Sequence, residues 1–388
     1  MTNKFKIKTF NNISKEGLKT FKDYEVGDSV GNPDAMVLRS QKLFGMEFEK
    51  NLLAVGRAGA GVNNIPIDEM SEKGVVIFNT PGANANAVKE LVISAMLLSA
   101  RNLLPAYDYV KELTGNNDEL SKKAEEGKKQ FSGFEIQGKT LGIVGLGAIG
   151  VIVANAAIGL GMKVIGFDPA ITIQNAWKLS AQVEKAASLN ELYAKSDFIT
   201  FHIPLLPQTK GMFSIDQLSQ IRDKTVLLNF SRAEIVDNKA VTKGIEEGKI
   251  KFYFSDFPCE EFKENKQVFS FPHLGASTEE AEENCAKMVC AQIKDYLENG
   301  NISNSVNFPE VYMPKTNGQR LAIVNRNIPN MLATISGELG QAEININDML
   351  NKSRGDYAYT LVDTDSNIPN NIIDRLLKVE GIIRVRLI

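Results

Sequence analysis

The sequence predicts an α/β protein built on a doubly wound parallel sheet, followed by a smaller βαββαβ module. Short apolar runs that suit buried strands alternate with helix-like segments through most of the chain. A glycine-rich turn at residues 145–150 lies between an apolar run, 140–144, and a helix-like segment, 149–161. The last 70 residues follow the order strand, helix, strand, strand, helix, strand, which is that of a ferredoxin-like module.

The segment before the glycine-rich turn has an α/β pattern of its own. Residues 87–102 predict a helix, because Leu91, Ala95 and Leu98 recur at helical spacing. A polar stretch, 114–129, separates this segment from the turn. The short apolar runs that predict strands here are residues 37–39, 52–55 and 75–78.

Beyond the turn, the alternation continues as far as a long helix-like segment, 277–299. Residues 303–318 are polar and contain Pro309 and Pro314, which favours a linker. The runs that predict strands between the turn and the long helix are residues 163–167, 198–201, 226–229 and 252–254. In the final module, the segments with the clearest patterns are a strand at 320–324, a helix at 329–340, a strand at 357–363, a helix at 369–378 and a strand at 382–387.

Composition excludes several classes of protein. A length of 388 residues predicts two or three domains, and 43% hydrophobic with 23% charged residues is ordinary for a soluble globular protein. A net charge of −3 gives no reason to expect binding to nucleic acid or to an anionic membrane. No apolar stretch long enough to span a bilayer and no signal peptide are apparent, and the three cysteines form no CxxC pair. We therefore expect a cytoplasmic protein with reduced thiols and no metal site.

The glycine-rich turn has the context that a dinucleotide requires. In Gly145-x-Gly147-x-x-Gly150, one glycine permits a tight turn, the next lets the backbone approach a pyrophosphate, and the third lets the helix pack on the strand. Asp168 ends the next strand 18 residues after Gly150, near the roughly 20-residue offset at which an acid binds the ribose. Residues 169–172 offer no Arg or Lys for a 2′-phosphate, so we expect NAD. The alternative is a glycine-rich turn in an α/β domain that binds no cofactor.

Only two histidines, His202 and His273, are available for proton transfer, and both lie at the ends of predicted strands. Open α/β sheets place ligands there, and the ordinary pKa of histidine suits exchange of a proton with a hydroxyl. Arg232 also follows a strand and could bind a carboxylate bidentately, although a surface ion pair is the alternative.

Acidic residues follow the strand at 252–254, and one of them could raise the pKa of a neighbouring imidazole: Asp256, Glu260 and Glu261. A solvated acidic loop is the alternative. Taken together, a nicotinamide cofactor, an arginine, an acid and a histidine suit hydride and proton transfer on a 2-hydroxy acid.

The order of these motifs resembles the D-2-hydroxyacid dehydrogenase family. The resemblance is carried by the glycine-rich turn, Asp168, His202-x-Pro204-Leu205, Asn229-x-Ser231-Arg232, Asp256 and Pro272-His273-Leu274-Gly275-Ala276-Ser277-Thr278. The block from residues 55–62 to Asn79-Thr80-Pro81 looks like the phosphoglycerate dehydrogenase branch of that family, and the final module looks like an ACT domain.

The resemblance implies a Rossmann-type NAD-binding domain inserted in a discontinuous, flavodoxin-like substrate domain, with the active site in the cleft between them. The implied boundaries are 1–98 and 276–305 for the substrate domain, 99–275 for the NAD-binding domain, 306–318 for a linker and 319–388 for the ACT domain.

The resemblance also implies roles for individual residues. Arg232 would bind the substrate carboxylate and carbonyl, and His273 would be the general acid–base, paired with Glu261, or with Glu260 if the spacing misleads. His202 would then have a structural role beside the cofactor, and Asp256 would lie near the nicotinamide carboxamide. Arg57 would bind the substrate phosphate, and Ala58 and Gly59 would also contact the substrate. The expected cofactor contacts are Thr80, Gly145, Gly147, Ala148, Ile149, Gly150, Asp168, His202, Ile203, Pro204, Phe230, Ser231, Asp256, Gly275 and Ala276.

In the ACT-like module, Asn327 and Asn345 match positions that bind serine in regulated relatives, and Asn325 stands where a histidine is frequent. A departure from the family pattern is Arg232-Ala233-Glu234, where Arg-Gly-Gly is usual. The activity implied is NAD-dependent oxidation of D-3-phosphoglycerate to 3-phosphohydroxypyruvate, the first step of L-serine synthesis, in a homodimer or homotetramer with L-serine as effector. The alternatives are a dehydrogenase for lactate, glyoxylate or hydroxypyruvate, and a non-catalytic NAD-sensing protein.

Overall fold

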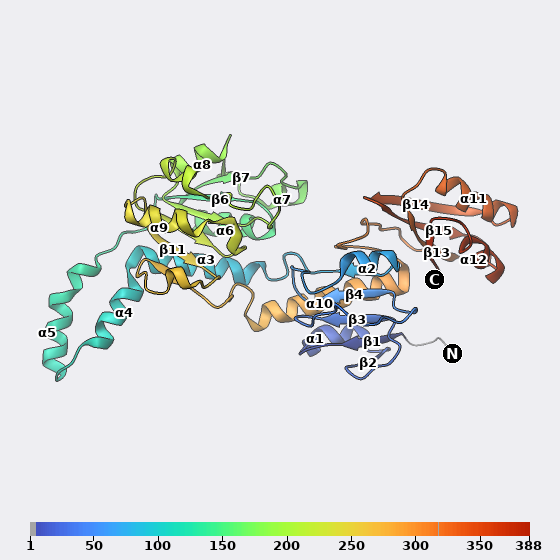
Figure 1. Ribbon diagram of the computed structural model, residues 1–388, viewed down its shortest axis with the longest axis horizontal. Coiled ribbons are helices and arrows are strands. Elements are labelled where there is room, and N and C mark those ends of the chain that lie inside the picture. Colours follow the sequence, from blue (N-terminus) through green and yellow to red (C-terminus); the bar gives the residue numbers. More distant parts are fainter. Residues whose placement is uncertain (1–4, 317) are drawn as a thin grey trace. The chain divides into compact units, whose positions relative to one another are not determined.

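The computed structural model describes residues 5–316 and 318–388, whose contacts form two compact units (Figure 1). Unit 1 combines the chain up to Asn84 with Glu279–Ile388, and unit 2 is Ala85–Thr278. The chain therefore passes from unit 1 to unit 2 before helix α3 (Ala85–Arg101), whereas the boundary implied by the resemblance, after residue 98, falls inside that helix. The reason is that buried side chains of α3, such as Val88 and Val92, belong to the core of unit 2.

Unit 1 contains, in its described part, a five-stranded parallel sheet of order β2-β1-β3-β4-β5. Its strands alternate in the side chains that they bury: Ala54 and Phe78 face helix α10, whereas Val55 and Ile77 join the core beside helix α2. The bounds are β1 (Lys6–Thr9), β2 (Glu25–Gly27), β3 (Ala35–Leu38), β4 (Ala54–Arg57), β5 (Val76–Phe78), α1 (Lys15–Leu18), α2 (Ile67–Glu72) and α10 (Glu279–Asn299).

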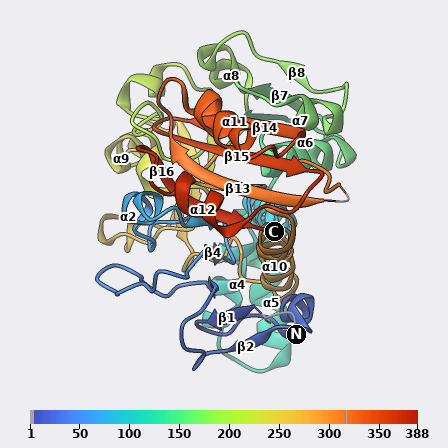
Figure 2. The same cartoon turned by 90° about the vertical axis from the view of Figure 1, so that its right-hand side faces the viewer.

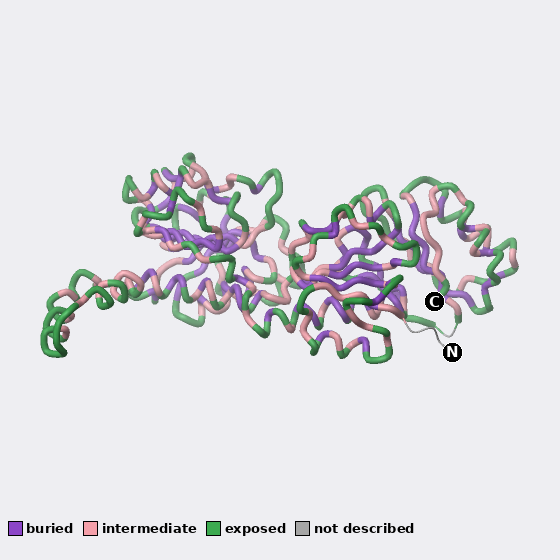
Figure 3. Tube along the Cα trace, turned by 60° about the horizontal axis from the view of Figure 1, so that its bottom comes forward, coloured by how far each residue is buried: buried purple, intermediate pink, exposed green. Residues whose placement is uncertain are grey.

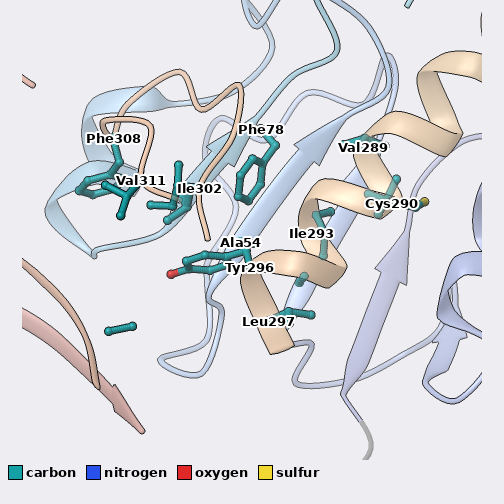
Figure 4. Packing of buried hydrophobic residues seen from close by; sticks show 14 of the residues in the cluster. Ala54, Phe78, Val289, Cys290, Ile293, Tyr296, Leu297, Ile302, Phe308 and Val311 are labelled. Atoms are coloured by element: carbon teal, nitrogen blue, oxygen red, sulfur yellow. The ribbon is translucent and has the colours of Figure 1, made fainter. Parts of the chain in front are cut away.

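Helix α10 supplies one wall of this core. Figure 4 shows Val289, Ile293 and Tyr296 of α10 against Phe78 and Ala54 of the strands. These side chains recur at helical spacing, so one face of α10 is apolar. The long helix predicted at 277–299 is confirmed, and it returns the chain to unit 1.

Residues 318–388 form the four-stranded antiparallel sheet of the expected βαββαβ module, with order β14-β15-β13-β16 (Figure 2). Helices α11 and α12 cover one face, where Ile323 and Val362 are buried, and the opposite face joins the core around α10 through Val324 and Leu361. The bounds are β13 (Gln319–Arg326), α11 (Met331–Gln341), β14 (Ile346–Arg354), β15 (Tyr357–Thr364), α12 (Asn370–Leu376) and β16 (Ile382–Leu387).

The segment predicted as a linker packs against unit 1. Phe308 and Val311 are buried, and Ile302 pairs with Val311 in an antiparallel bridge. The amide of Asn307 accepts from Ile77 N and donates to Val75 O, both at 2.9 Å. Because Phe308, Val311 and Met313 enter the core, this segment fixes the module to the rest of unit 1.

A buried ion pair joins the module to this segment and to α10. Arg320, fully buried, donates to both carboxylate oxygens of Asp363 at 2.6 and 2.7 Å. Its remaining N–H groups donate to the carbonyl oxygens of Asn299, Met313 and Pro314 at 2.8–2.9 Å. The guanidinium charge is therefore balanced by the carboxylate of Asp363, and its N–H groups have hydrogen-bond partners, as a buried arginine requires.

Unit 2, which is described throughout, contains a seven-stranded parallel sheet of order β12-β11-β10-β9-β6-β7-β8. Helices α3 and α6 cover one face, and α8 and α9 cover the other. The bounds are β6 (Thr140–Val144), β7 (Lys163–Phe167), β8 (Glu184–Lys185), β9 (Phe198–Phe201), β10 (Thr225–Asn229), β11 (Ile250–Ser255), β12 (Val268–Ser270), α6 (Ala148–Gly159), α7 (Ile173–Lys178), α8 (Leu189–Lys195) and α9 (Asn238–Glu246). Figure 3 shows that burial is concentrated along these strands.

In unit 2, β7 and β8 extend the sheet on one side of β6, and β9 to β12 extend it on the other, so the order of strands reverses between the neighbours β6 and β9. Ligands of doubly wound sheets bind outside the carboxyl ends of the strands at such a switch point. The doubly wound sheet predicted from the sequence is therefore confirmed, and it places the glycine-rich turn at the expected edge.

A helical hairpin of α4 (Leu103–Glu112) and α5 (Asn117–Gly127) extends unit 2. Every residue of both helices is at least partly exposed. Helix α5 occupies the stretch predicted only as polar, and it begins at a capping box in which Asn116 and Glu119 bond reciprocally. No helix in the described part of the chain combines the length and the hydropathy needed to cross a membrane.

We predict that Asp363→Ala lowers the free energy of unfolding by about 3–5 kcal/mol, because it leaves Arg320 buried without its partner. Burial alone would raise the pKa of Asp363, but hydrogen bonds from Arg320 and Thr316 and the charge of Arg320 outweigh it and lower that pKa below 3.8. The stabilisation is thus present above pH 3.8 and is lost as the pH falls through the lowered folded-state pKa. Urea unfolding at several pH values measures both effects. The control Glu69→Ala removes an exposed ion pair with Lys73 and should cost less than about 1 kcal/mol; an equal loss in both variants would contradict the prediction.

Candidate active site

The three glycines of the turn after β6 have different roles in the structure. Gly145 has φ +94°, and a Cβ there would lie 2.5 Å from the carbonyl oxygen of His202. A Cβ on Gly150 would lie 2.0 Å from the carbonyl oxygen of Gly145, so only glycine permits this close approach of helix and strand. A Cβ on Gly147, the N-cap of α6, would meet no atom within 4 Å, so this face of the turn is open to a ligand.

Asp168 is held against this turn. One carboxylate oxygen accepts from Leu146 N at 2.8 Å and the other from Ala170 N at 2.9 Å. The half-buried carboxylate at the end of β7 is thus fixed beside the open face of the turn. Together with the exposed Ala148 and half-buried Ile149 at the first turn of α6, these groups suit the ribose and pyrophosphate of NAD.

His202 follows β9 directly, next to the glycine-rich turn. Burial lowers the pKa of the imidazole to about 3, so the ring stays neutral. Its Nε2 lies 3.0 Å from Thr200 Oγ1, and Nδ1 has no hydrogen-bond partner in the described part of the chain. The next two residues along the chain are Ile203, which is half-buried, and Pro204, which is exposed.

Arg232 lies in the loop after β10 and is exposed. Its Nη1 donates to Ser231 O at 2.6 Å, and Ser231 Oγ in turn donates to Phe201 O at the end of β9. Phe230 is buried beneath the loop, and Glu234 is exposed beside Arg232. The loop therefore presents one cation and one acid at the carboxyl edge of the sheet.

Asp256 organises the loop that carries His273. Its carboxylate oxygens accept from Leu274 N at 2.8 Å and Gly275 N at 2.7 Å, and its carbonyl oxygen accepts from His273 N at 3.1 Å. His273 is exposed and adopts φ +57°, a left-handed conformation that is uncommon outside glycine. The side chain of Asp256 is 1% exposed, so in this structure its oxygens serve the loop; contact with the nicotinamide stays a prediction.

The pairing of His273 with an acid also stays a prediction. Glu260 and Glu261 lie in a short 3-10 helix (Glu260–Phe262) after β11, and both are exposed. Within residues 5–316 and 318–388, no hydrogen bond or ion pair joins either glutamate to the ring of His273. The ring instead makes an edge contact with Phe257, with 5.4 Å between centroids.

In unit 1, Arg57 ends β4, and its guanidinium is held under the loop that follows. Nε donates to Arg39 O at 2.9 Å, and Nη1 donates to Gly61 O. Gly59 accepts from Thr80 N at 3.1 Å, which ties the loops after β4 and β5 together, and the side chain of Ala58 is buried. The side chain of Thr80 is fully buried in unit 1, so its contact with the cofactor remains a prediction.

The candidate effector residues lie on different parts of the C-terminal module. Asn327 and Asn345 are exposed, with side-chain bonds to Gly355 O and to Asp365. Asn325 lies within β13, is 1% exposed and donates to Arg326 O at 2.7 Å.

The sequence analysis gave two residues near these loops no role in the site. Arg39 follows β3, accepts from Arg57 through its carbonyl oxygen and pairs with Glu282. Asn229 ends β10 and bonds to the main chain of the Arg232 loop. The signal used for Asp168 and Asp256, a polar residue at the carboxyl end of a predicted strand, also applies to Arg39 and Asn229 and could have identified both.

We predict that Gly147→Ala leaves the thermal unfolding temperature nearly unchanged but weakens NADH binding by at least tenfold, because the added methyl occupies the face left open to the pyrophosphate. Gly150→Ala should instead lower the unfolding temperature, since its Cβ overlaps Gly145 O. Fluorescence titration with NADH and thermal unfolding of both variants separate the two effects. Undiminished NADH affinity in Gly147→Ala would contradict the assignment.

Comparison with known proteins identifies the family. Residues 93–277 match the family model of the D-isomer specific 2-hydroxyacid dehydrogenase NAD-binding domain. The chain is 36% identical over 300 residues to D-3-phosphoglycerate dehydrogenase of Methanocaldococcus jannaschii, a match that covers 75% of this chain and 55% of that protein. It is 30% identical over 355 residues to D-3-phosphoglycerate dehydrogenase of Haemophilus influenzae, covering 88% of this chain and 83% of that protein.

A solved structure, NAD⁺-bound 3-phosphoglycerate dehydrogenase of Entamoeba histolytica, is 25% identical with a TM-score of 0.60, over 78% of this chain and 99% of that one. The chain thus spans about half the length of the Methanocaldococcus relative and most of the Haemophilus relative. The match of the NAD-binding domain agrees with the glycine-rich turn at the switch point of unit 2. The chain therefore carries an NAD-binding domain and belongs to the D-isomer-specific 2-hydroxyacid dehydrogenase family.

Proposed function

We propose that the chain catalyses the NAD-dependent oxidation of D-3-phosphoglycerate to 3-phosphohydroxypyruvate, and the reverse reduction. One observation carries the proposal. Arg232 and His273 are both exposed, and both lie in loops at the edge of the unit 2 sheet that also carries the open glycine-rich turn. The names of the Methanocaldococcus and Haemophilus relatives support the choice of substrate.

His273 is the general acid–base of the proposed reaction. It takes the proton of the substrate hydroxyl during oxidation and returns a proton to the carbonyl oxygen during reduction. NAD, when bound, accepts a hydride from the carbon that bears the hydroxyl. Glu261 pairs with His273 in this scheme and fixes its tautomer, with Glu260 as the alternative partner.

Arg232 binds the substrate carboxylate and carbonyl in the proposed scheme. A guanidinium offers two parallel N–H groups to a carboxylate, which fixes both position and orientation. Orientation matters because transfer of a hydride requires the reacting carbon to be held in one geometry.

Arg57, with Ala58 and Gly59, binds the substrate phosphate in the proposal. Arg39 supports this role, because it is a second cation at the carboxyl edge of the same sheet and its carbonyl oxygen anchors the Arg57 guanidinium. Its ion pair with Glu282 is partly exposed and so is weakly held.

We further propose that the C-terminal module binds L-serine, with Asn327, beside the buried Asn325 at the end of β13, and Asn345, at the opposite end of the sheet, as separate candidate contacts. Addition of L-serine to the assay below tests this role, and unchanged rate and affinity would remove it. A homo-oligomer is also proposed, since α4 exposes Leu103, Tyr107 and Val110.

The central experiment is an NADH absorbance assay with 3-phosphohydroxypyruvate. We predict turnover by the unmodified chain and a kcat lowered about 10²–10⁴-fold in His273→Ala, with NADH affinity unchanged. Glu261→Gln should also lower kcat, whereas Glu264→Gln, an exposed acid in the same loop, should not. A wild-type rate with pyruvate or glyoxylate but not with the phosphorylated acid would indicate another dehydrogenase of the family, and NADH binding without any turnover would indicate a sensor.

A second prediction concerns the phosphate. Arg57→Ala should raise KM for 3-phosphohydroxypyruvate by at least tenfold and change KM for hydroxypyruvate little, because only the first substrate carries the phosphate. Arg222→Ala, which removes an exposed arginine paired with Asp197 in unit 2, is the matched control. An equal rise in KM for both substrates in Arg57→Ala would contradict the assignment of Arg57 to the phosphate.

A further inference from the structure

The side chain of Asn229 is fully buried at the carboxyl end of β10, directly before the loop that carries Arg232. Its Nδ2 donates to Arg232 O at 2.8 Å, and its Oδ1 accepts from Ser231 N at 3.2 Å. One side chain thus bonds to the main chain of both residues around which the loop turns. We infer that Asn229 is a positioning residue, which sets the direction of the Arg232 side chain and hence the binding of the substrate carboxylate; the inference rests on the proposed function.

Few side chains can replace this amide. The loop offers one carbonyl oxygen and one N–H group, so the partner must donate and accept at the same place. An aspartate of equal size keeps the acceptor but puts an anion against the Arg232 carbonyl oxygen, and an alanine leaves both main-chain groups without a partner.

Tyr253 of the neighbouring strand supports the amide from behind. Its buried hydroxyl lies 3.4 Å from Asn229 Nδ2. Burial raises the pKa of Tyr253, so the hydroxyl remains protonated and neutral at physiological pH. The amide therefore has a buried polar neighbour that accepts from Nδ2.

Asn229 also connects the two loops proposed to act on the substrate. Its carbonyl oxygen accepts from Asp256 N at 3.3 Å, and the carboxylate of Asp256 accepts from the loop of His273. The ends of β10 and β11 thus form one hydrogen-bonded network under Arg232 and His273.

The guanidinium itself has little to hold it. The bond from Nη1 to the neighbouring Ser231 O is local, and Arg232 is exposed. The direction of the side chain therefore follows the main chain of residues 231–232, which Asn229 fixes. A displacement of about 1 Å at such a group can cost on the order of 100-fold in rate.

A double-mutant cycle tests the inference with 3-phosphohydroxypyruvate and NADH. Asn229→Ala should lower kcat/KM on the order of 100-fold, mainly through KM for the keto acid, with NADH affinity unchanged. If Asn229 acts through Arg232, then Asn229→Ala combined with Arg232→Ala should be no worse than Arg232→Ala alone. A residue that only stabilises the fold would give additive losses, which would overturn the inference.

Thr225→Val is the matched structural control, because Thr225 is buried at the opposite end of β10 and its hydroxyl donates to Arg222 O at 2.8 Å. It should lower the unfolding temperature and leave KM unchanged. If Asn229→Ala does not fold, Asn229→Asp replaces it in the cycle, with the same expectation. An unchanged KM in Arg232→Ala would refute the proposed role of Arg232. If KM rises in Arg232→Ala but stays unchanged in the Asn229 variant, only the inference about Asn229 is refuted.

Discussion

Parallel pairing of β6, β9, β10 and β11 brings the carboxyl ends of four strands to one edge of the unit 2 sheet. The glycine-rich turn, His202 and Asp256 follow these ends directly, and Arg232 follows β10 after two residues. Because the strands run in one direction and in register, residues far apart in the sequence share an edge without any contact between their own side chains. The cofactor assignment and the proposed chemistry both depend on this constraint.

Polar side chains, half-buried in Asp168 and buried in Asn229 and Asp256, fix the loops at that edge. Asp168 binds the turn after β6, Asn229 binds the loop of Arg232, and Asp256 binds the loop of His273. Each accepts from or donates to main-chain groups that a loop would otherwise leave without partners. The exposed Arg232 and His273, proposed to act on the substrate, are thus supported by the buried Asn229 and Asp256, which do not need to touch it.

The C-terminal module is attached to unit 1 in a similar way, through arginines that donate to main-chain oxygens. Arg320 binds the end of α10 and the following segment, Arg386 binds Leu297 O, and Arg384 binds Lys73 O. The segment whose proline and polar content suggested a linker is therefore part of the core that it connects. Composition did not predict this, because a few well-placed apolar residues suffice to bury a polar stretch.

The sequence by itself determined the fold class, the NAD cofactor and the family, because each depends on local spacing: apolar runs, Gly145-x-Gly147-x-x-Gly150 and a strand that ends in Asp168. It also identified Arg232 and His273 as candidates, because both follow strands. Only the tertiary structure decided that the surroundings of the His202 ring lower its pKa, that Asp256 supports the loop of His273, and that Asn229 holds the loop of Arg232. Burial and hydrogen-bond partners are set by neighbouring strands, which the order of residues along one strand does not specify.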